Sequence, residues 1–454
     1  MVYDLIIKNG VLIGPKDQSR VDIGIQNGKI ITLDSGLVGK ESIDASGLYV
    51  LPGAIDPHVH LEMPAGSLFS SDDWDSGTKA AAIGGTTTII DFVEPLPSQS
   101  LMSAFKDRLS QAKNRAFIDY SFHMTLNDST PETLAQITDV IDSGITSFKT
   151  YTTYDDPLSD DDFINIFTAM KKNGGLVITH AENDAIIRYM QHELISQSKL
   201  GPASHPKSRP ANSEGVEIER IVSLAETINA PVYIVHISTE RGARALARAK
   251  KRGQIVFGET CPQYLILRDD KYIQPGFEGA KYVCSPPLRQ EQDNLYLWDA
   301  LAKDVIQTIG TDHCPFFYKG QKDIGIECFT KIPGGLPGIE SRLSLIHTFG
   351  VLTNRLDINQ WVETCCTNPA KIFGLYPSKG IIEPGSDSDI VLFDPRKKIT
   401  IRHENLHENV DYTPYEGLCL TGYPVMTILG GQVIAQENEF MGTSPQGSFV
   451  KRSI

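Results

Sequence analysis

The sequence contains no long apolar run and no secretory signal. A membrane-spanning helix needs about 20 consecutive apolar residues, and no run in this 454-residue chain approaches that length. The N-terminus, MVYDLIIKNG, lacks the basic start and the small-residue cleavage site of a signal peptide. We therefore expect a cytoplasmic protein with no membrane partner.

Positive charge is also scarce. The chain has 42 Lys and Arg against 56 Asp and Glu, which gives a formal net charge of -14. Proteins that bind nucleic acid cluster Lys and Arg against the phosphates, so we expect no nucleic-acid partner. The acidity is expected to serve solubility.

Cysteine is present, but not in a pattern that predicts a disulfide framework or a zinc knuckle. The seven cysteines include no C-x-x-C pair. We expect reduced and mostly buried thiols, as is usual for cytosolic proteins.

The two ends of the chain resemble each other. Both consist of short apolar runs separated by Asn-Gly or Gly-Gly, a pattern typical of strands and hairpins. We predict one β-sandwich built from residues 1–50 and 376–440, because neither end alone has enough strands to bury a face. The polar, Gly/Ser-rich tail 441–454 is expected to be disordered unless it docks on a neighbouring subunit.

The middle of the chain, residues 51–375, alternates apolar runs with segments of helical period. This alternation predicts an α/β fold with a parallel sheet, and eight units predict a (β/α)8 TIM barrel. The eight runs are residues 48–56, 86–93, 117–125, 145–151, 175–180, 231–237, 254–261 and 305–313.

Polar side chains with metal-binding chemistry follow five of these runs. In a TIM barrel the carboxyl ends of the strands form the active site, and residues i and i+2 of a strand face the same side. Imidazole and carboxylate ligands together suit zinc or a similar divalent ion. Taken singly, a lone histidine is more often an ordinary buried residue than a ligand, the His58/His60 pair fits either role equally, and the lysine is more often the partner of a carboxylate. The residues are His58, His60, Lys149, His180, His236 and Asp312.

Several sequence motifs resemble those of the cyclic amidohydrolases, the family of dihydropyrimidinase and D-hydantoinase. The resemblance covers nearly the whole chain and keeps the order of the motifs. They include GAIDPHVHLEMP, SFKTYTTY, THAEND, ETCPQYL, SPPLR, GTDHCPF and PGGLPGIESRL.

This resemblance implies a centre of two divalent ions, with zinc the expected metal. One ion would be bound by His58, His60 and Asp312, and the other by His180 and His236. Carboxylated Lys149 would bridge the two ions.

The resemblance also implies a substrate site. Tyr154 would donate a hydrogen bond to the carbonyl oxygen under attack, and Ser285 would bind the substrate amide through its main chain. Gly334 would share that role, although relatives carry asparagine there, and the glycine adds flexibility.

The implied reaction opens the cyclic amide of a dihydropyrimidine or a 5-substituted hydantoin to an N-carbamoyl amino acid, with Asp312 as the proton carrier. Glu62 would repel an anion, which favours a small neutral substrate. A homotetramer is implied, with a dimer as the alternative. Two other functions remain open at this point: an allantoinase, and a non-catalytic dihydropyrimidinase-like assembly protein.

Overall fold

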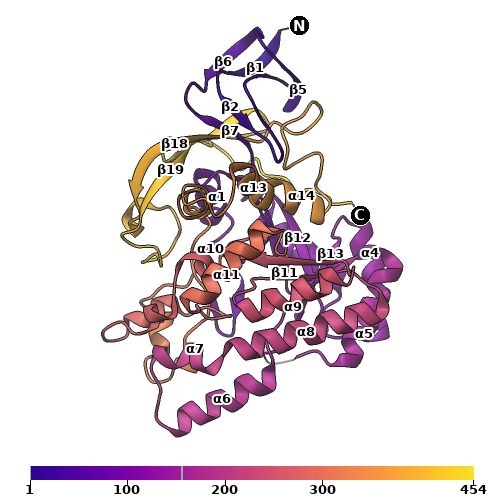
Figure 1. The fold of residues 1–454 in the computed structure, drawn as a ribbon. Helices are drawn as coiled ribbons and strands as arrows, with labels where there is room; N and C mark the ends of the chain where they lie inside the picture. Colours follow the sequence, from indigo (N-terminus) through magenta and orange to yellow (C-terminus); the bar gives the residue numbers. More distant parts are fainter. Residues whose placement is uncertain (1, 155–156, 454) are drawn as a thin grey trace.

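The computed structural model describes residues 2–154 and 157–453, which form a strand-rich part and a larger barrel (Figure 1). In Figure 1 the N-terminus lies in the strand-rich part at the top. The helices of the lower part surround strands that run through its centre. This arrangement confirms the predicted barrel with an accompanying β-sandwich.

Eight parallel strands form the barrel, in the sheet order β17-β16-β15-β14-β13-β12-β11-β8. Most of their side chains are buried, as expected for strands covered on both faces. Each predicted apolar run contributes one strand. The strands are β8 (Ala54–Asp56), β11 (Thr86–Val93), β12 (Asp119–Thr125), β13 (Ser147–Tyr151), β14 (Leu176–His180), β15 (Val232–Ile234), β16 (Val256–Thr260) and β17 (Thr308–Ile309).

The first and last barrel strands meet beyond their ends. Val59 forms a parallel bridge with His313, and the amide of His60 donates to the His313 carbonyl at 2.8 Å. The sheet is thereby closed at its carboxyl end, next to the predicted metal ligands.

Helices pack around this sheet. The segments of helical period between the apolar runs fold as helices, among them α2, α5 and α8. The α-helices are α1 (Ser76–Ile83), α2 (Leu101–Ala112), α3 (Pro131–Ala135), α4 (Ile137–Asp142), α5 (Asp160–Asn173), α6 (Asp184–Ser196), α7 (His205–Ser208), α8 (Ala211–Ile228), α9 (Glu240–Lys251), α10 (Pro262–Ile266), α11 (Glu291–Ala302), α12 (Arg342–Ile346), α13 (Ile358–Val362) and α14 (Asn368–Ile372).

Two further sheets form the β-sandwich. One has the order β5-β4-β1-β6 and the other β21-β20-β19-β18-β7-β2-β3. Side chains from both chain ends, such as Ile23 and Ile390, share one buried cluster. The strands are β1 (Tyr3–Lys8), β2 (Val11–Ile13), β3 (Gln18–Ser19), β4 (Asp22–Gln26), β5 (Lys29–Asp34), β6 (Gly39–Asp44), β7 (Tyr49–Pro52), β18 (Ile390–Thr400), β19 (Cys419–Leu429), β20 (Gln432–Gln436) and β21 (Glu439–Phe440).

Two local predictions were wrong. The run 48–56 is not one strand: it splits at Gly53 into β7 of the sandwich and β8 of the barrel. The first Asn-Gly, at Asn9, does not close a hairpin, because β1 and β2 belong to different sheets. The second does: Asn27 and Gly28, both with positive φ, join the antiparallel strands β4 and β5.

The C-terminal tail is ordered against its own barrel, contrary to the expectation of disorder without a neighbouring subunit. The Val450 amide donates to the Tyr120 carbonyl at 2.8 Å, and the Arg452 amide donates to the Gly144 carbonyl at 3.0 Å. Phe449 stacks on Phe122, with 5.6 Å between ring centres. Figure 1 shows the chain ending beside β12 and β13.

Two expectations about composition can be compared with the structure. Within the described ranges, no helix combines the length and apolarity needed to cross a membrane. All seven cysteines are free thiols, and five of them are buried.

Candidate metal centre

Three predicted ligands meet at the carboxyl end of the barrel. His58 Nε2 and His60 Nε2 each lie 3.2 Å from Asp312 Oδ1. His58 and His60 follow β8, and Asp312 follows β17, so barrel closure unites residues about 250 positions apart. One potential ligand atom from each residue lies within 4.8 Å of the others, an arrangement that could hold a metal ion.

A second pair of histidines adjoins this group. His180 ends β14, and its Nδ1 lies 3.0 Å from Nε2 of His236, which follows β15. The rings of His58 and His236 stack with their centres 5.4 Å apart. The structure therefore brings all four predicted histidines and Asp312 to one place.

The backbone at this place adopts left-handed conformations that favour glycine. Positive φ angles occur at Tyr154 (83°), His236 (39°) and Asp312 (53°). A non-glycine residue with positive φ is uncommon, and such strain collects at functional sites. Three of the predicted site residues therefore lie at strained positions.

Lys149 lies on β13 and is 1% exposed. Burial lowers the pKa of its amine to about 8, although Asp312, Glu259 and Glu94 oppose that shift. Among the described residues, Asp312 and Glu259 direct their ion pairs to histidines, and Lys149 forms none within 4 Å. The alternative of a lysine paired with a carboxylate is therefore not what the structure contains.

The protonation states suit metal binding. Burial lowers the pKa of His58, His180 and His236 below the ordinary 6.5, so these imidazoles are neutral at pH 7. Burial opposes ionisation of Asp312, but neighbouring His58 and His60 outweigh it and lower the pKa of the carboxyl below 3.8. Neutral imidazole and ionised carboxylate are the forms that bind metals.

An unsatisfied nitrogen atom also fits a metal. Within the described chain, His58 Nε2, the nitrogen that faces Asp312, is buried and has no hydrogen-bond partner. Unpaired buried polar atoms are costly and need an explanation. An ion at about 2.0–2.1 Å from each ligand would fit between donor atoms that are 3.0–3.2 Å apart.

Two glutamates that the sequence analysis did not single out hold the histidines in place. Glu259, at the end of β16, accepts from His58 Nδ1 at 2.6 Å and from the His236 amide at 3.1 Å. Glu182 accepts from His180 Nε2 at 2.9 Å and pairs with Arg209. Such carboxylate–histidine contacts orient metal ligands. The sequence signal was present, since both glutamates lie in the THAEND and ETCPQYL motifs.

The predicted substrate-binding residues lie beside this centre. The ring centre of Tyr154 is 5.1 Å from that of His180. Desolvation raises the pKa of Tyr154 above 10 even though Arg209 opposes it, so the hydroxyl remains a donor. Ser285 and Gly334 are neighbours, because a Cβ placed at residue 334 would lie 3.2 Å from Ser285 Oγ.

Lys322, also missed, ties the segments of Ser285 and Gly334 together. This fully buried lysine donates to the Val283 carbonyl at 2.8 Å and the Pro333 carbonyl at 3.0 Å. The sequence does not indicate that Lys322 is buried, because nothing in it distinguishes this residue from a surface lysine.

Glu62 does not present a free negative charge. Its carboxylate accepts two hydrogen bonds from Arg115, at 2.9 and 3.0 Å. The charge argument for a neutral substrate therefore loses its basis. Met63 and Phe69, which follow the histidine pair in the sequence, line a cavity of about 260 Å³ that also contains His60 and Glu94. Tyr151 donates to Glu94 at 3.3 Å, and Leu68 lies in the adjacent short strand β10 (Leu68–Phe69).

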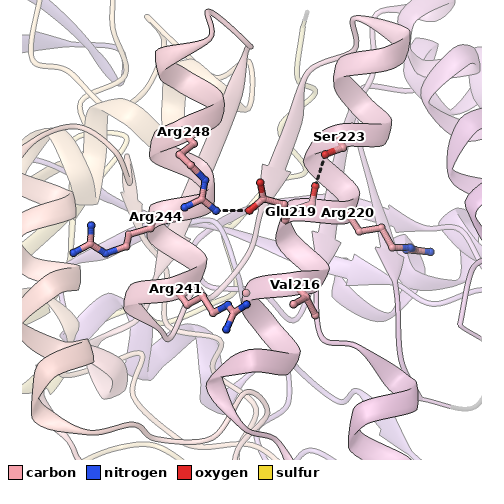
Figure 2. Close-up of a pocket in the computed structure, with 8 residues that line it drawn as sticks. Val216, Glu219, Arg220, Ser223, Arg241, Arg244 and Arg248 are labelled. Carbon is pink, nitrogen blue, oxygen red and sulfur yellow. Dashed lines mark hydrogen bonds and ion pairs between the residues drawn. The ribbon is translucent and has the colours of Figure 1, made fainter.

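A larger groove on the outside of the barrel is a poorer candidate. This groove of about 500 Å³ lies between α8 and α9 and is rich in arginine (Figure 2). Glu219 pairs with Arg248 there, while Arg220 pairs with Asp160 and Glu217 outside the view. Its charges are thus largely neutralised, and it contains none of the predicted ligands.

Comparison with known proteins agrees with the geometry. Residues 49–434 match the amidohydrolase family. The chain is 42% identical to a D-hydantoinase of Geobacillus stearothermophilus, over 99% of this chain and 96% of that protein. It is 41% identical to a D-hydantoinase of Rhizobium radiobacter, over 99% of both. The crystal structure of a dihydropyrimidinase from Brevibacillus agri NCHU1002 superposes with a TM-score of 0.97 at 40% identity, covering 99% of this chain and 98% of that one. The chain belongs to the amidohydrolase family and, within it, to the dihydropyrimidinase and D-hydantoinase family of cyclic amidohydrolases.

Proposed function

We propose that this protein is a binuclear-metal hydrolase that opens the cyclic amide bond of dihydropyrimidines or 5-substituted hydantoins and releases N-carbamoyl amino acids. The observation that supports it most is the meeting of four histidines, Asp312 and the buried Lys149 at one end of the barrel. The names of the relatives support the substrate class.

In this proposal, His58, His60 and Asp312 hold one divalent ion, zinc being the expected metal. His180 and His236 would hold a second, and Lys149, carboxylated by carbon dioxide, would supply an anionic ligand to both. Its pKa of about 8 supports this role, because only the neutral amine can form a carbamate. A bound pair of such ions supplies a Lewis acid for the amide carbonyl and lowers the pKa of a coordinated water.

Asp312 is the proposed proton carrier. Its carboxyl has a lowered pKa and is therefore ionised at neutral pH, which is the form that can accept a proton from the attacking water. The same carboxyl then donates that proton to the ring nitrogen as the C–N bond breaks. The leaving group is thus released as a neutral amide nitrogen rather than an anion.

Tyr154, Ser285 and Gly334 are the proposed substrate-binding residues. The hydroxyl of Tyr154 would donate to the amide oxygen, on which negative charge develops in the transition state. Main-chain groups of Ser285 and Gly334 would hold the remaining amide of the ring. The adjacency of Ser285 and Gly334 supports this pairing.

A substrate panel tests the proposal. Zinc-loaded protein is assayed on dihydrouracil, 5-phenylhydantoin, hydantoin and allantoin, and the optical purity of the N-carbamoylphenylglycine formed from 5-phenylhydantoin is recorded. Turnover of dihydrouracil or a substituted hydantoin is expected. Turnover of allantoin alone would instead identify an allantoinase, and no turnover of any ring by metal-loaded protein would refute the proposal.

We further propose, from the family, that the protein is a cytoplasmic homotetramer, divided into a sandwich of residues 1–50 and 376–440, a barrel of residues 51–375 and a tail of residues 441–454. Light scattering on purified protein is expected to give a mass near four times 50.0 kDa. A mass of two chains would favour the dimer.

A further inference from the structure

The side chain of Arg452 enters the barrel from the end opposite the metal centre. The residue is 4% exposed although it lies only two positions from the end of the chain. Its Nη1 donates to Ser147 Oγ at 2.8 Å, and its Nη2 donates to the Phe122 carbonyl. Ser147 and Phe122 lie on the neighbouring strands β13 and β12.

The hydrogen bonds continue from Arg452 toward the metal centre. Ser147 Oγ lies 2.5 Å from His123 Nδ1, and His123 Nε2 lies 2.9 Å from the Pro57 carbonyl. A guanidinium only donates, and a carbonyl only accepts. Burial lowers the pKa of His123 well below 6.5, so its imidazole is neutral and carries one N–H. The directions are therefore fixed: Arg452 donates to Ser147, Ser147 donates to His123 Nδ1, and His123 Nε2–H donates to Pro57.

Two members of this relay, Pro57 and Ser147, adjoin proposed ligands. Pro57 directly precedes His58, so the peptide that His123 holds also carries the first histidine ligand. Ser147 and Lys149 are two positions apart on β13, so they share one face of the strand. Ser147, His123 and Lys149 are all buried.

The tail is built to deliver Arg452 to this point. Backbone hydrogen bonds to Tyr120 and Gly144 fix the chain on either side of Val450. The backbone of Ser453 lies against Gly374, where a Cβ would collide with the Ser453 carbonyl. Backbone contacts of the tail therefore fix the position of Arg452, and no mobile side chain at the surface is needed to hold it there.

Charge pairing does not explain why Arg452 is buried. No carboxylate among residues 2–154 and 157–453 forms an ion pair with it, and burial lowers its pKa to about 9. An unpaired buried cation is unfavourable unless its hydrogen bonds compensate. Its side-chain hydrogen bonds go to the Phe122 carbonyl and to Ser147, and the contact with Ser147 is the one that leads to Pro57.

We propose that Arg452 is a positioning residue for the metal centre: through Ser147 and His123 it orients the Pro57–His58 peptide and the strand that carries Lys149. This inference rests on the proposed function only in assuming that His58 and Lys149 bind metal. Mutation of a residue that orients a metal ligand typically lowers metal affinity by about 10–100-fold.

The test compares Arg452→Met with the matched control Lys451→Met, which changes the exposed neighbour. Zinc release from the loaded, full-length protein to a chelator is followed spectroscopically, together with the thermal midpoint. We expect Arg452→Met to release zinc about tenfold faster or more, and Lys451→Met to release it at the wild-type rate.

A second variant separates positioning from general stability. Ser147→Ala breaks the relay but leaves Arg452 and the tail in place, and it should also accelerate zinc release. Added guanidinium ion should restore slow release in Arg452→Gly. If Arg452→Met does not fold, Ser147→Ala and the guanidinium rescue decide the matter.

Wild-type zinc release in Ser147→Ala and in folded Arg452→Met, with only a lower thermal midpoint, would overturn the inference. A failure of the positioning role can be distinguished from a failure of the proposed reaction. Wild-type protein that retains zinc but opens no cyclic amide refutes the reaction and leaves the test of Arg452 valid. Wild-type protein that retains no zinc refutes both.

Discussion

At the scale of single residues, Lys149 is the most informative position, because its neutral amine is where a bridging carbamate would form. Lys149→Ala should lose metal and activity together, and short carboxylic acids with bicarbonate should partly restore both. Zinc content measured by mass spectrometry, alongside ring-opening activity, checks this. The exposed Lys172→Ala serves as the control. Unchanged zinc content in Lys149→Ala would refute the bridging role.

The lowered pKa of Lys149 predicts a pH dependence for reconstitution. Below a pKa of about 8 the amine is mostly protonated and cannot attack carbon dioxide; above it the neutral form dominates. Metal-free protein given zinc and bicarbonate should therefore recover activity faster as pH rises through about 8. A rate that stays flat from pH 7 to pH 9 at constant dissolved carbon dioxide would contradict this.

Tyr154 tests the proposed stabilisation of the transition state. Tyr154→Phe removes one hydroxyl donor and should lower kcat by about 10²–10³, with zinc content unchanged. Steady-state kinetics on the best substrate measures it, with Tyr189→Phe, which is 63% exposed in the wild type, as the control. A kcat within twofold of wild type would show that Tyr154 plays no such role.

The sequence predicted the residues that follow strand ends but not the residues that support them. His58, His180 and Asp312 could be predicted from the sequence, because each lies at or just after the end of an apolar run. Glu259 lies in the ETCPQYL motif, but its contact with His58 could not be predicted, because the two residues are 201 positions apart and only barrel closure makes them neighbours. Arg452 was harder still, since its polar surroundings in the sequence suggest a free tail.

At the scale of structural elements, Lys322 joins two segments that the proposed substrate site needs. Lys322→Met would leave the Val283 and Pro333 carbonyls without their donor, and the segment of Gly334 would lose its restraint. We expect KM to rise about tenfold with zinc content unchanged, as measured by kinetics and metal analysis. The nearby exposed Lys331→Met is the control. Wild-type KM in Lys322→Met would contradict this assignment.

Turn signals were reliable only where the flanking strands share a sheet. Asn27-Gly28 closes a hairpin, whereas the same dipeptide at Asn9 directs the chain from one sheet to the other. Local backbone preference allows positive φ in both cases: Asn9 has φ of 63° and Asn27 has φ of 51°. The sheet that each strand joins is decided by long-range packing, which the dipeptide does not encode.

At the scale of the whole molecule, Lys379 connects the barrel to the sandwich. Its ammonium lies 2.7 Å from Asp119 at the start of β12 and 2.6 Å from Asp389 beside β18, with Asp387 at 3.2 Å. Lys379→Met would leave Asp119 and Asp389 without a cation, whereas Asp387 would keep its ion pair with Lys29. Breaking a buried pair from one side costs about 3–5 kcal/mol.

We therefore expect Lys379→Met to lower the free energy of unfolding by about that amount, as measured by denaturant titration, with the exposed Lys371→Met as control. Although burial opposes it, the carboxylates raise the pKa of Lys379 above 10.5. The contribution should be fully present below pH 10.5 and be lost only as pH rises further. A Lys379→Met effect below 1 kcal/mol would contradict this account.

The architecture of the whole chain was the most predictable feature. Eight buried strands alternating with helices leave few alternatives to a closed barrel, and the paired ends share one core. The division at residues 50, 375 and 440 remains a prediction. The position of the tail was not predictable, because its backbone contacts involve carbonyls and glycines that carry no distinctive sequence signal.

The most direct test is a crystal structure of zinc-loaded protein with anomalous diffraction recorded at the zinc edge. The account predicts two strong peaks per chain: one bound by His58, His60 and Asp312, and the other by His180 and His236. Continuous density should extend from Lys149 Nζ between them. A single peak, or peaks confined to the surface with unmodified Lys149, would contradict the central claim.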